Sequence, residues 1–299
     1  GLNKGERVVT LIPSTPEFHE TFFATAKAGL VLVPVNYLYL GEEITYAVNN
    51  IEASVLVIDK RYLDKVEPIK PNLPSVKHYI TIGESATTTS YEQLLASYPP
   101  ESPKVDISHE DLALILYTSG TTARPKAVMH THRSAYAFVL ACGPLLHIQP
   151  EKDICLVMAP SYHIAAAPKV VATTYFLDTA VILESFDPGP FLQAIERHKV
   201  TNVFSPLVPT MLIRLLDYPD FGKYDISSLR CVFIGVNIIP RPLLRRTIEA
   251  FGPKVFNLYG STEASAVMTL MEPGELRLDL PSDKMWPRST LAMWGDKGG

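Results

Sequence analysis

Cysteine is scarce in this chain, and its spacing excludes the usual cysteine-based structures. The 299 residues include only three cysteines, Cys142, Cys155 and Cys231. An odd number without a Cys-x-x-Cys pair indicates neither a disulfide framework nor a zinc site. We therefore interpret them as small apolar residues in a reducing, cytoplasmic compartment, with a catalytic thiol as the less favoured alternative.

An excess of charge of one sign is also missing. Lys and Arg number 27 and Asp and Glu number 31, so the formal net charge is −4. Nucleic acids and anionic membrane surfaces are bound by clustered basic side chains, and the sequence has no such block. We therefore expect neither kind of partner, and nothing in the sequence indicates an oligomeric state.

Long hydrophobic runs are lacking as well. The apolar stretches at 29–35 and 169–183 are too short for a bilayer or are interrupted by Lys169 and Asp178, so we expect no transmembrane helix. The chain starts at Gly1, without an initiator methionine or a basic and apolar leader. No targeting segment can be read from it, and we expect it to begin inside a longer gene product.

The residues that are present fit a globular α/β protein. Hydrophobic residues make up 47% and charged residues 19% of a chain long enough to bury a full core. Short β-branched runs alternate with amphipathic stretches, which is typical of βαβ units around a mainly parallel sheet. In the first part we expect a helix capped by Ser14 or Thr15, a helix at 42–50, and strands at 8–12, 30–35 and 55–58.

A segment rich in Ser, Thr and Pro at 83–105 interrupts this rhythm and predicts a surface loop or linker. After it we expect helices at 134–145, 191–198, 210–217 and 243–251, and strands at 112–117, 127–130, 154–158, 180–183, 202–205, 231–234 and 255–258. The sequence thus predicts two packed α/β subdomains with mainly parallel sheets flanked by helices, at 1–102 and 103–271, and an irregular or partly disordered tail at 272–299.

The strongest local signal is Tyr117-Thr-Ser-Gly-Thr-Thr-Ala-Arg-Pro-Lys126, a hydroxyl-rich loop after a buried strand. Its hydroxyls and backbone N–H groups can surround phosphoryl oxygens, while Lys126 supplies a positive charge. It is not a Walker A loop, because Pro125 occupies the place of the second glycine and Ala127 follows the lysine. A phosphoryl-transfer P-loop enzyme is therefore disfavoured, and the bland alternative is a polar turn with an exposed lysine.

Two further segments support a specific resemblance: Asn257-Leu-Tyr-Gly-Ser-Thr-Glu263 and Ala159-Pro-Ser-Tyr-His163. With the 117–126 loop, they resemble the elements YTSGTTGxPKGV and NxYGxTE of the adenylate-forming superfamily and the segment that lines its acyl site. That superfamily contains acyl-CoA synthetases, luciferases and peptide-synthetase adenylation domains. The resemblance covers residues 1–271, and the chain resembles the acyl-CoA synthetases and fatty-acid–CoA ligases of that superfamily.

The resemblance implies an enzyme that uses ATP and Mg²⁺ to convert a carboxylic acid into an acyl-adenylate, releasing pyrophosphate, with CoA as the final acceptor. It implies catalytic roles for Lys126, Thr262, Glu263 and His163, with Glu263 as the Mg²⁺ ligand and Tyr259 stacked on adenine. Carboxylate oxygen is the ligand type that Mg²⁺ prefers. The expected nucleotide-binding residues are Thr118, Ser119, Gly120, Thr121, Thr122, Lys126, Gly235, Asn257, Tyr259, Gly260 and Thr262.

Structural alternatives exist for these assignments. Tyr259 could be a buried strand aromatic, Thr262 a helix N-cap and Glu263 a first-turn acid favoured by the helix dipole. A single histidine beside apolar residues, such as His163, is as readily a packed core histidine as a catalytic one.

The lack of an acidic residue in one segment narrows the class of acid that is activated. Amino-acid-activating relatives place an aspartate in the segment corresponding to 159–167 to pair the substrate ammonium, and here that segment has no acid. A buried, unpaired ammonium would be costly, so amino acids are disfavoured. We expect an aryl or acyl acid, with a fatty acid as the default.

The sequence departs from the family pattern in several places. Ala123 and Ala127 replace glycines, which would cost about 1 kcal/mol wherever positive φ is needed. Only Gly235 of Gly235-Val-Asn237 matches the Gly-Gly-Ala/Ser expected against adenine. The ribose-binding aspartate, the hinge and the lid domain with its catalytic lysine are not in this sequence. A segment that binds nucleotide or a partner without catalysis is therefore the alternative function.

Overall fold

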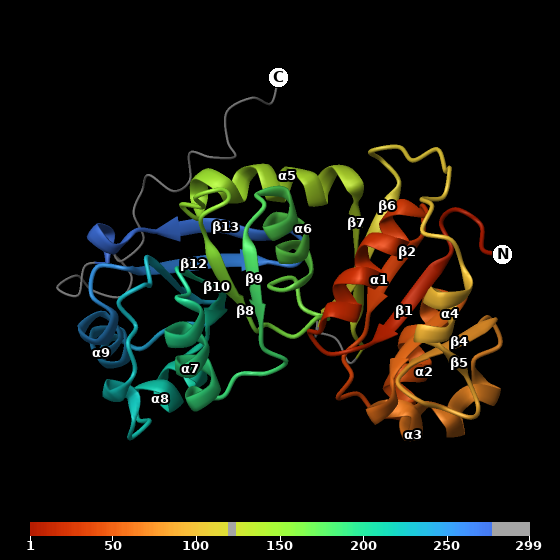
Figure 1. Ribbon diagram of the computed structural model, residues 1–299, viewed down its shortest axis with the longest axis horizontal. Coiled ribbons are helices and arrows are strands. Elements are labelled where there is room, and N and C mark those ends of the chain that lie inside the picture. Colours follow the sequence, from red (N-terminus) through yellow and green to blue (C-terminus); the bar gives the residue numbers. More distant parts are fainter. Residues whose placement is uncertain (119–123, 277–299) are drawn as a thin grey trace. The chain divides into compact units, whose positions relative to one another are not determined.

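The computed structural model describes residues 1–118 and 124–276 (Figure 1). Within them the chain forms two compact units. The first comprises residues 1–137 and 160–170, and the second comprises residues 138–159 and those from 171 onward. Each unit is built on its own sheet.

The first unit contains a seven-stranded sheet in the order β5-β4-β3-β1-β2-β6-β7. Its neighbours pair in parallel, except that β7 runs antiparallel to β6. The helices are α1 (Pro16–Lys27), α2 (Gly41–Asn50), α3 (Leu63–Val66) and α4 (Tyr91–Ser97), with short 3₁₀ turns at Lys60–Tyr62 and Glu67–Asn72. The strands are β1 (Arg7–Leu11), β2 (Val31–Pro34), β3 (Val55–Asp59), β4 (His78–Ile82), β5 (Thr89–Ser90), β6 (Leu112–Thr118) and β7 (Lys126–Thr131).

The second unit contains a six-stranded sheet in the order β13-β12-β11-β10-β8-β9, parallel apart from the β12–β13 pair. Its strands are β8 (Ile154–Val157), β9 (Thr179–Ile182), β10 (Asn202–Leu207), β11 (Cys231–Gly235), β12 (Val255–Ser261) and β13 (Ala266–Met271). The remaining helices are α5 (His132–Leu145), α6 (Ala167–Tyr175), α7 (Pro188–His198), α8 (Pro209–Leu216) and α9 (Arg241–Phe251), with 3₁₀ turns at Phe221–Lys223 and Pro273–Glu275. The predicted fold class is confirmed: two mainly parallel mixed sheets with flanking helices.

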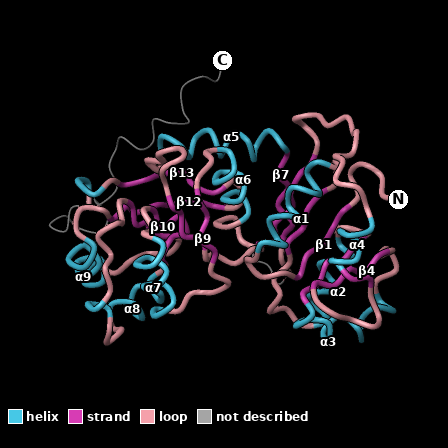
Figure 2. Tube along the Cα trace, viewed as in Figure 1, coloured by secondary structure: helices cyan, strands magenta, loops and turns pink. Residues whose placement is uncertain are grey.

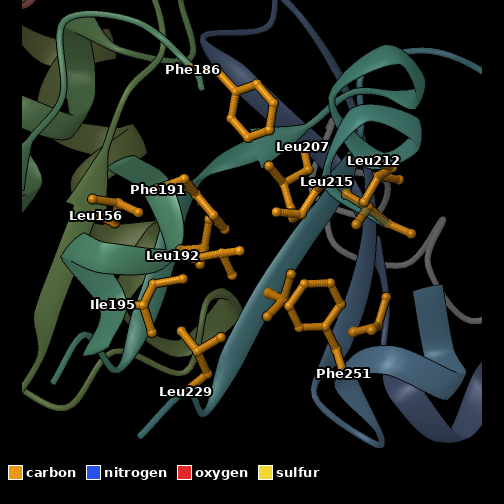
Figure 3. Close-up of a cluster of buried hydrophobic side chains, with 14 of the residues drawn as sticks. Leu156, Phe186, Phe191, Leu192, Ile195, Leu207, Leu212, Leu215, Leu229 and Phe251 are labelled. Carbon is orange, nitrogen blue, oxygen red and sulfur yellow. The ribbon is translucent and has the colours of Figure 1, made fainter. Parts of the chain in front are cut away.

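Helix α7 illustrates why the second unit folds. Asp187 caps it and Pro188 occupies its first turn, where a missing N–H costs nothing. Figure 3 shows Phe191, Leu192 and Ile195 among the buried side chains of the core. Burying each such side chain contributes roughly 1.5–3 kcal/mol, so this helix is held mainly by its apolar face.

Several expected elements differ from those observed. The 83–105 segment is not wholly a loop, since it contains β5 and α4, and the Ser90 hydroxyl caps α4 by accepting from the Gln93 N–H at 3.4 Å. An irregular stretch separates α4 from β6 (Figure 2). At α1 the N-cap residue is Thr15, but its side chain makes no capping hydrogen bond. Strands β4 and β13 and helix α6 were not expected.

The division of the chain also differs from the expected boundary at residues 102 and 103. Leu114 of β6 pairs with Leu32 of β2, so β6 and its partner β7 complete the first sheet. The expected tail at 272–299 begins with the 3₁₀ turn at Pro273–Glu275, and the rest of it lies outside the described residues.

The cysteines that can be described are buried. Cys155 and Cys231 are buried in the second unit and form no disulfide within the described residues, and burial raises the pKa of the Cys231 thiol to about 11. A thiol that stays protonated at neutral pH is a poor nucleophile, which fits the interpretation of small apolar residues. Along the stretches with described coordinates, no helix combines the length and apolarity needed to cross a membrane.

Candidate nucleotide site

The 117–126 loop joins β6 to β7 in the first unit. Thr118 at the end of β6 lies directly opposite Lys126 at the start of β7, and the Lys126 side chain is exposed. Opposite residues of an antiparallel pair have side chains on the same face. The hydroxyl of Thr118 and the ammonium of Lys126 therefore project from the same face of the sheet. The predicted residues Ser119, Gly120, Thr121 and Thr122 lie outside the described residues.

The next pair along the ladder, Tyr117 and Ala127, packs against the opposite face. Both contact the buried cluster that includes Ile44, Ala47 and Val48. Ala127 has an extended backbone rather than a positive φ. The strain considered for an alanine at this position is therefore absent, and its methyl group lies on the face away from Lys126. Ala123 falls outside the described residues.

The second predicted segment forms the hairpin of β12 and β13 in the second unit. Tyr259 lies opposite Thr269 with 49% of its surface exposed, and the register shifts between Tyr259 and Gly260. An irregularity of this kind re-aims the side chains beside it. Tyr259 is therefore half-exposed and is not the buried strand aromatic of the structural alternative.

Thr262 and Glu263 lie in the tight turn of this hairpin. The Ser265 N–H donates to the Thr262 carbonyl at 3.1 Å, and the Ala264 N–H donates to the Ser261 hydroxyl at 3.3 Å. No helix starts here, so Thr262 is not a helix N-cap and Glu263 is not a first-turn acid. The sequence-based alternatives for these two residues are wrong.

Glu263 has the chemistry of a magnesium ligand. Its side chain is exposed, and among the described residues none forms an ion pair with it. A free, hard carboxylate oxygen is what Mg²⁺ takes from a protein while it keeps several waters and binds phosphates. The residue present fits the ion that the sequence implies.

Gly235 lies on β11, the strand that pairs with β12 of the hairpin, and Asn257 lies on β12 itself. Gly235 ends β11 with φ +137°, and a Cβ added there would lie 2.1 Å from the Leu258 carbonyl oxygen and 3.2 Å from Asn257 Oδ1. Glycine is therefore required for the close approach of β11 to β12. The residues of the second unit that were predicted to bind nucleotide, Gly235, Asn257, Tyr259, Gly260 and Thr262, lie along these two adjacent strands and the turn that follows.

His163 lies in the 160–170 segment of the first unit, where the Ala165 N–H donates to its Nδ1 at 3.0 Å. Burial lowers the pKa of His163, so the imidazole is neutral at pH 7 with its proton on Nε2. The neighbouring Ser161 hydroxyl donates to the Ile12 carbonyl, and the Tyr162 ring meets Tyr37 edge-on at 5.2 Å. These contacts hold the segment against the first unit.

A groove of about 1090 Å³ runs along α2 in the first unit. Its lining includes Leu40, Tyr46, Asn50, Ile69 and Asn72. None of the predicted site residues that the structure describes lines it. The residues of α2 that contact the 117–126 loop were not found from the sequence, since they precede it by about 70 positions and carry no motif.

Comparisons with known proteins agree with the motifs. A family model described as "AMP-binding enzyme" matches residues 1–290. Feruloyl-CoA synthase from an Amycolatopsis species is 33% identical over 285 residues, which cover 93% of this chain and 52% of that enzyme. The long-chain-fatty-acid–CoA ligase of Bacillus subtilis is 27% identical over 335 residues, which cover 100% of this chain and 58% of the ligase.

Solved structures with a similar fold agree with these matches. The inhibitor-bound N-terminal domain of FACL13 from Mycobacterium tuberculosis superposes with a TM-score of 0.83 at 25% identity, over 92% of this chain and 67% of that one. The chain spans about half the length of the curated relatives that it matches. A family match over nearly all of its residues, with both nucleotide motifs present, shows that the chain belongs to the AMP-binding enzymes, the adenylate-forming superfamily that its motifs resemble.

Proposed function

We propose that the protein containing this chain activates a carboxylic acid with ATP and that this chain carries the nucleotide and acid sites. A carboxylate oxygen attacks the α-phosphorus of ATP, the bond to the bridging oxygen breaks, and pyrophosphate leaves with the electron pair. The thiol sulfur of CoA then attacks the acyl carbon, loses its proton and displaces AMP. The observation that carries the proposal is the presence of both the 117–126 motif and the 257–263 motif in one chain of this family.

The first unit supplies the phosphate contacts in this proposal. Two anions must approach each other when a carboxylate attacks ATP, so a cation beside the phosphates lowers the barrier. Lys126 is exposed, and Thr118 lies opposite it on the same face. We assign Lys126 to the transferring phosphate oxygens and the Thr118 hydroxyl to a supporting hydrogen bond, together with Ser119, Gly120, Thr121 and Thr122.

The second unit supplies the adenosine and metal contacts. We assign the half-exposed ring of Tyr259 to adenine, together with Gly235, Asn257 and Gly260 along β11 and β12. Thr262 would donate its hydroxyl to the α-phosphate, and Glu263 would hold Mg²⁺, which would supply positive charge beside the phosphates.

The acid is proposed to be aryl or aliphatic and to carry no ammonium group. The 159–167 segment contains no acidic residue that could pair an ammonium, and the pKa of His163 is lowered by burial, which keeps its imidazole uncharged. A neutral imidazole can donate through Nε2 to a carboxylate or pack against an apolar chain. The relatives include enzymes named for a hydroxycinnamic acid and for long-chain fatty acids, which fits either kind of acid.

Exchange of labelled pyrophosphate into ATP tests the proposal, because it requires only the first half-reaction. We expect exchange that depends on an added fatty or aryl acid, such as ferulate or palmitate. Lys126→Ala and Glu263→Gln should each reduce it at least about 100-fold, the scale of losing one charge stabiliser at a transition state. His78→Ala, which changes an exposed residue of β4, serves as the matched control.

The alternative is a segment that binds nucleotide without catalysis. It predicts MgATP binding by calorimetry but no acid-dependent exchange. Exchange that persists unchanged in both Lys126→Ala and Glu263→Gln would remove the proposed site.

A further inference from the structure

Helix α2 contacts the strand that enters the 117–126 loop. The Tyr117 hydroxyl donates to the Ala47 carbonyl at 2.9 Å and accepts from Asn50 Nδ2 at 3.1 Å. Burial raises the pKa of Tyr117, so the hydroxyl keeps its proton and remains a donor over the neutral range. The last turn of α2 thus fixes the residue that precedes Thr118.

The same helix contacts the end of the loop, just before β7 begins. The Tyr46 hydroxyl donates to the Pro125 carbonyl at 3.2 Å, and the Arg124 guanidinium carbon lies 5.2 Å from the centroid of the Tyr46 ring. Pro125 immediately precedes Lys126. Tyr46 therefore holds the peptide that carries the lysine, while its ring lies 6.5 Å from that of Tyr117 at the other end.

Helix α2 is a firm support for these contacts. Ile44, Ala47 and Val48 are fully buried in the core of the first unit, with at most 1% of their surface exposed. Side chains on a helix packed this way are fixed relative to the sheet, and a shift of the loop strands would break hydrogen bonds at both ends. The proposed phosphate contacts do not involve Tyr46, Asn50 or the Tyr117 hydroxyl. These groups can therefore act by positioning the loop without touching the nucleotide.

We propose that Tyr46 and Asn50 are positioning residues that hold Lys126 and Thr118 in register for the phosphates of ATP. The inference rests on the proposed function, since it names the support of that same nucleotide site. Arg124 stands at the unspecified position of the family signature. The contact of Arg124 with the Tyr46 ring therefore adds a support for the loop that depends on the residue type at this variable position.

Titration of the chain with MgATP and with adenosine tests the inference. Tyr46→Phe removes one hydroxyl hydrogen bond and Asn50→Ala removes one amide hydrogen bond, and each should weaken MgATP binding about 5-fold. Tyr46→Ala also removes the ring beneath Arg124 and should weaken it at least about 10-fold. Adenosine affinity should stay at the wild-type value, because adenosine has no phosphate.

Asn49→Ala is the matched control. Asn49 neighbours Asn50 in the last turn of α2, but its amide donates to the Asn72 carbonyl at 2.9 Å, away from the loop. It should leave both affinities unchanged. Wild-type MgATP affinity in Tyr46→Ala, or equal losses for MgATP and adenosine, would overturn the inference, because the latter result indicates general damage to the fold.

Hydrogen exchange without nucleotide separates this inference from the proposed function. The backbone amides of Tyr117, Thr118, Arg124, Lys126 and Ala127 should exchange faster in Tyr46→Ala than in Asn49→Ala, since local opening follows the loss of local contacts. A wild-type chain that binds neither ligand refutes the proposed function, and with it the role in nucleotide binding. Unchanged exchange in Tyr46→Ala refutes the anchoring itself.

Discussion

At the scale of single residues, backbone strain gathers at the end of β11. Val236 has φ +66° and 41% of its surface exposed. A β-branched side chain in the left-handed region crowds its own backbone and costs about 1–2 kcal/mol. This is the position where the resemblance implied a second glycine, so the departure noticed in the sequence has a physical counterpart in the structure.

Replacing Val236 by glycine should therefore stabilise the protein. Relief of strain is offset in part by the greater freedom of glycine in the unfolded chain, which leaves a net gain of about 0.5–1 kcal/mol. The free energy of unfolding in urea measures it. Val236→Ala, which keeps a Cβ but loses the branching, should fall between the two, and a Val236→Gly variant less stable than Val236→Ala would contradict the strain.

Asp178 is a second residue whose environment opposes folding. Burial and the nearby carboxylate of Asp153 raise the pKa of Asp178 to about 6. Asp153 is itself buried and paired with Arg230 at 2.7 Å. The folded protein thus keeps the Asp178 proton up to about pH 6, whereas the unfolded chain loses it near the ordinary value of 3.8.

This proton makes stability fall as pH rises from about 4 to about 6, because the folded state binds more protons than the unfolded state in that window. Asp178→Asn has no such loss. After discounting for partial exposure, we expect Asp178→Asn to be about 1 kcal/mol more stable than the wild type at pH 7 and to lose this advantage near pH 4. Unfolding at several pH values measures the difference, and an advantage independent of pH would contradict the account.

At the scale of elements, buried parallel strands were the easiest to predict. Every residue of β1 after Arg7, and every residue of β3, β10 and β11, is buried, which gives mainly apolar runs in the sequence, with few polar residues among them. Strand β4 has a mixed pattern with one buried residue, and its strand state depends on pairing with β3. A strand state that depends on pairing with a distant segment cannot be read from the local sequence, so β4 and the short β5 were not predicted.

Helix α7 offers a prediction at this scale. Asp187 Oδ1 accepts from the Gly189 N–H at 3.3 Å, and its Oδ2 lies 3.2 Å from Arg214 Nη2. Asp187→Ala should cost about 1 kcal/mol through loss of the cap. Asp187→Asn keeps the cap and loses only an exposed ion pair, which contributes a few tenths of a kcal/mol. In thermal unfolding, Asp187→Asn should be nearly as stable as the wild type and Asp187→Ala less stable than both. Equal losses of stability in the two variants would show that the ion pair, and not the cap, is responsible.

At the scale of the whole molecule, the sequence predicted the fold class but not where the chain divides. The apparent break at 83–105 suggested a boundary near residue 102, yet the next two strands join the first sheet through the pairing of Leu114 with Leu32. Hydrophobic periodicity does not reveal which strands far apart in sequence pair with each other. For the same reason the contacts of Tyr46 and Asn50 with the loop could not be predicted. The motifs around Lys126 and Glu263 could be recognised because their residues are contiguous in the sequence.

Calorimetric measurement of MgATP affinity tests most directly whether both segments bind one nucleotide. The proteins compared are the wild type, Lys126→Ala, Glu263→Gln and the double variant. Each single change should weaken binding about 10–100-fold, the range for a lost hydrogen bond to a charged group. Glu263→Gln should also abolish the gain in affinity that Mg²⁺ gives. Wild-type affinity in either single variant would contradict the account, since one of the two segments would then lie outside the nucleotide site.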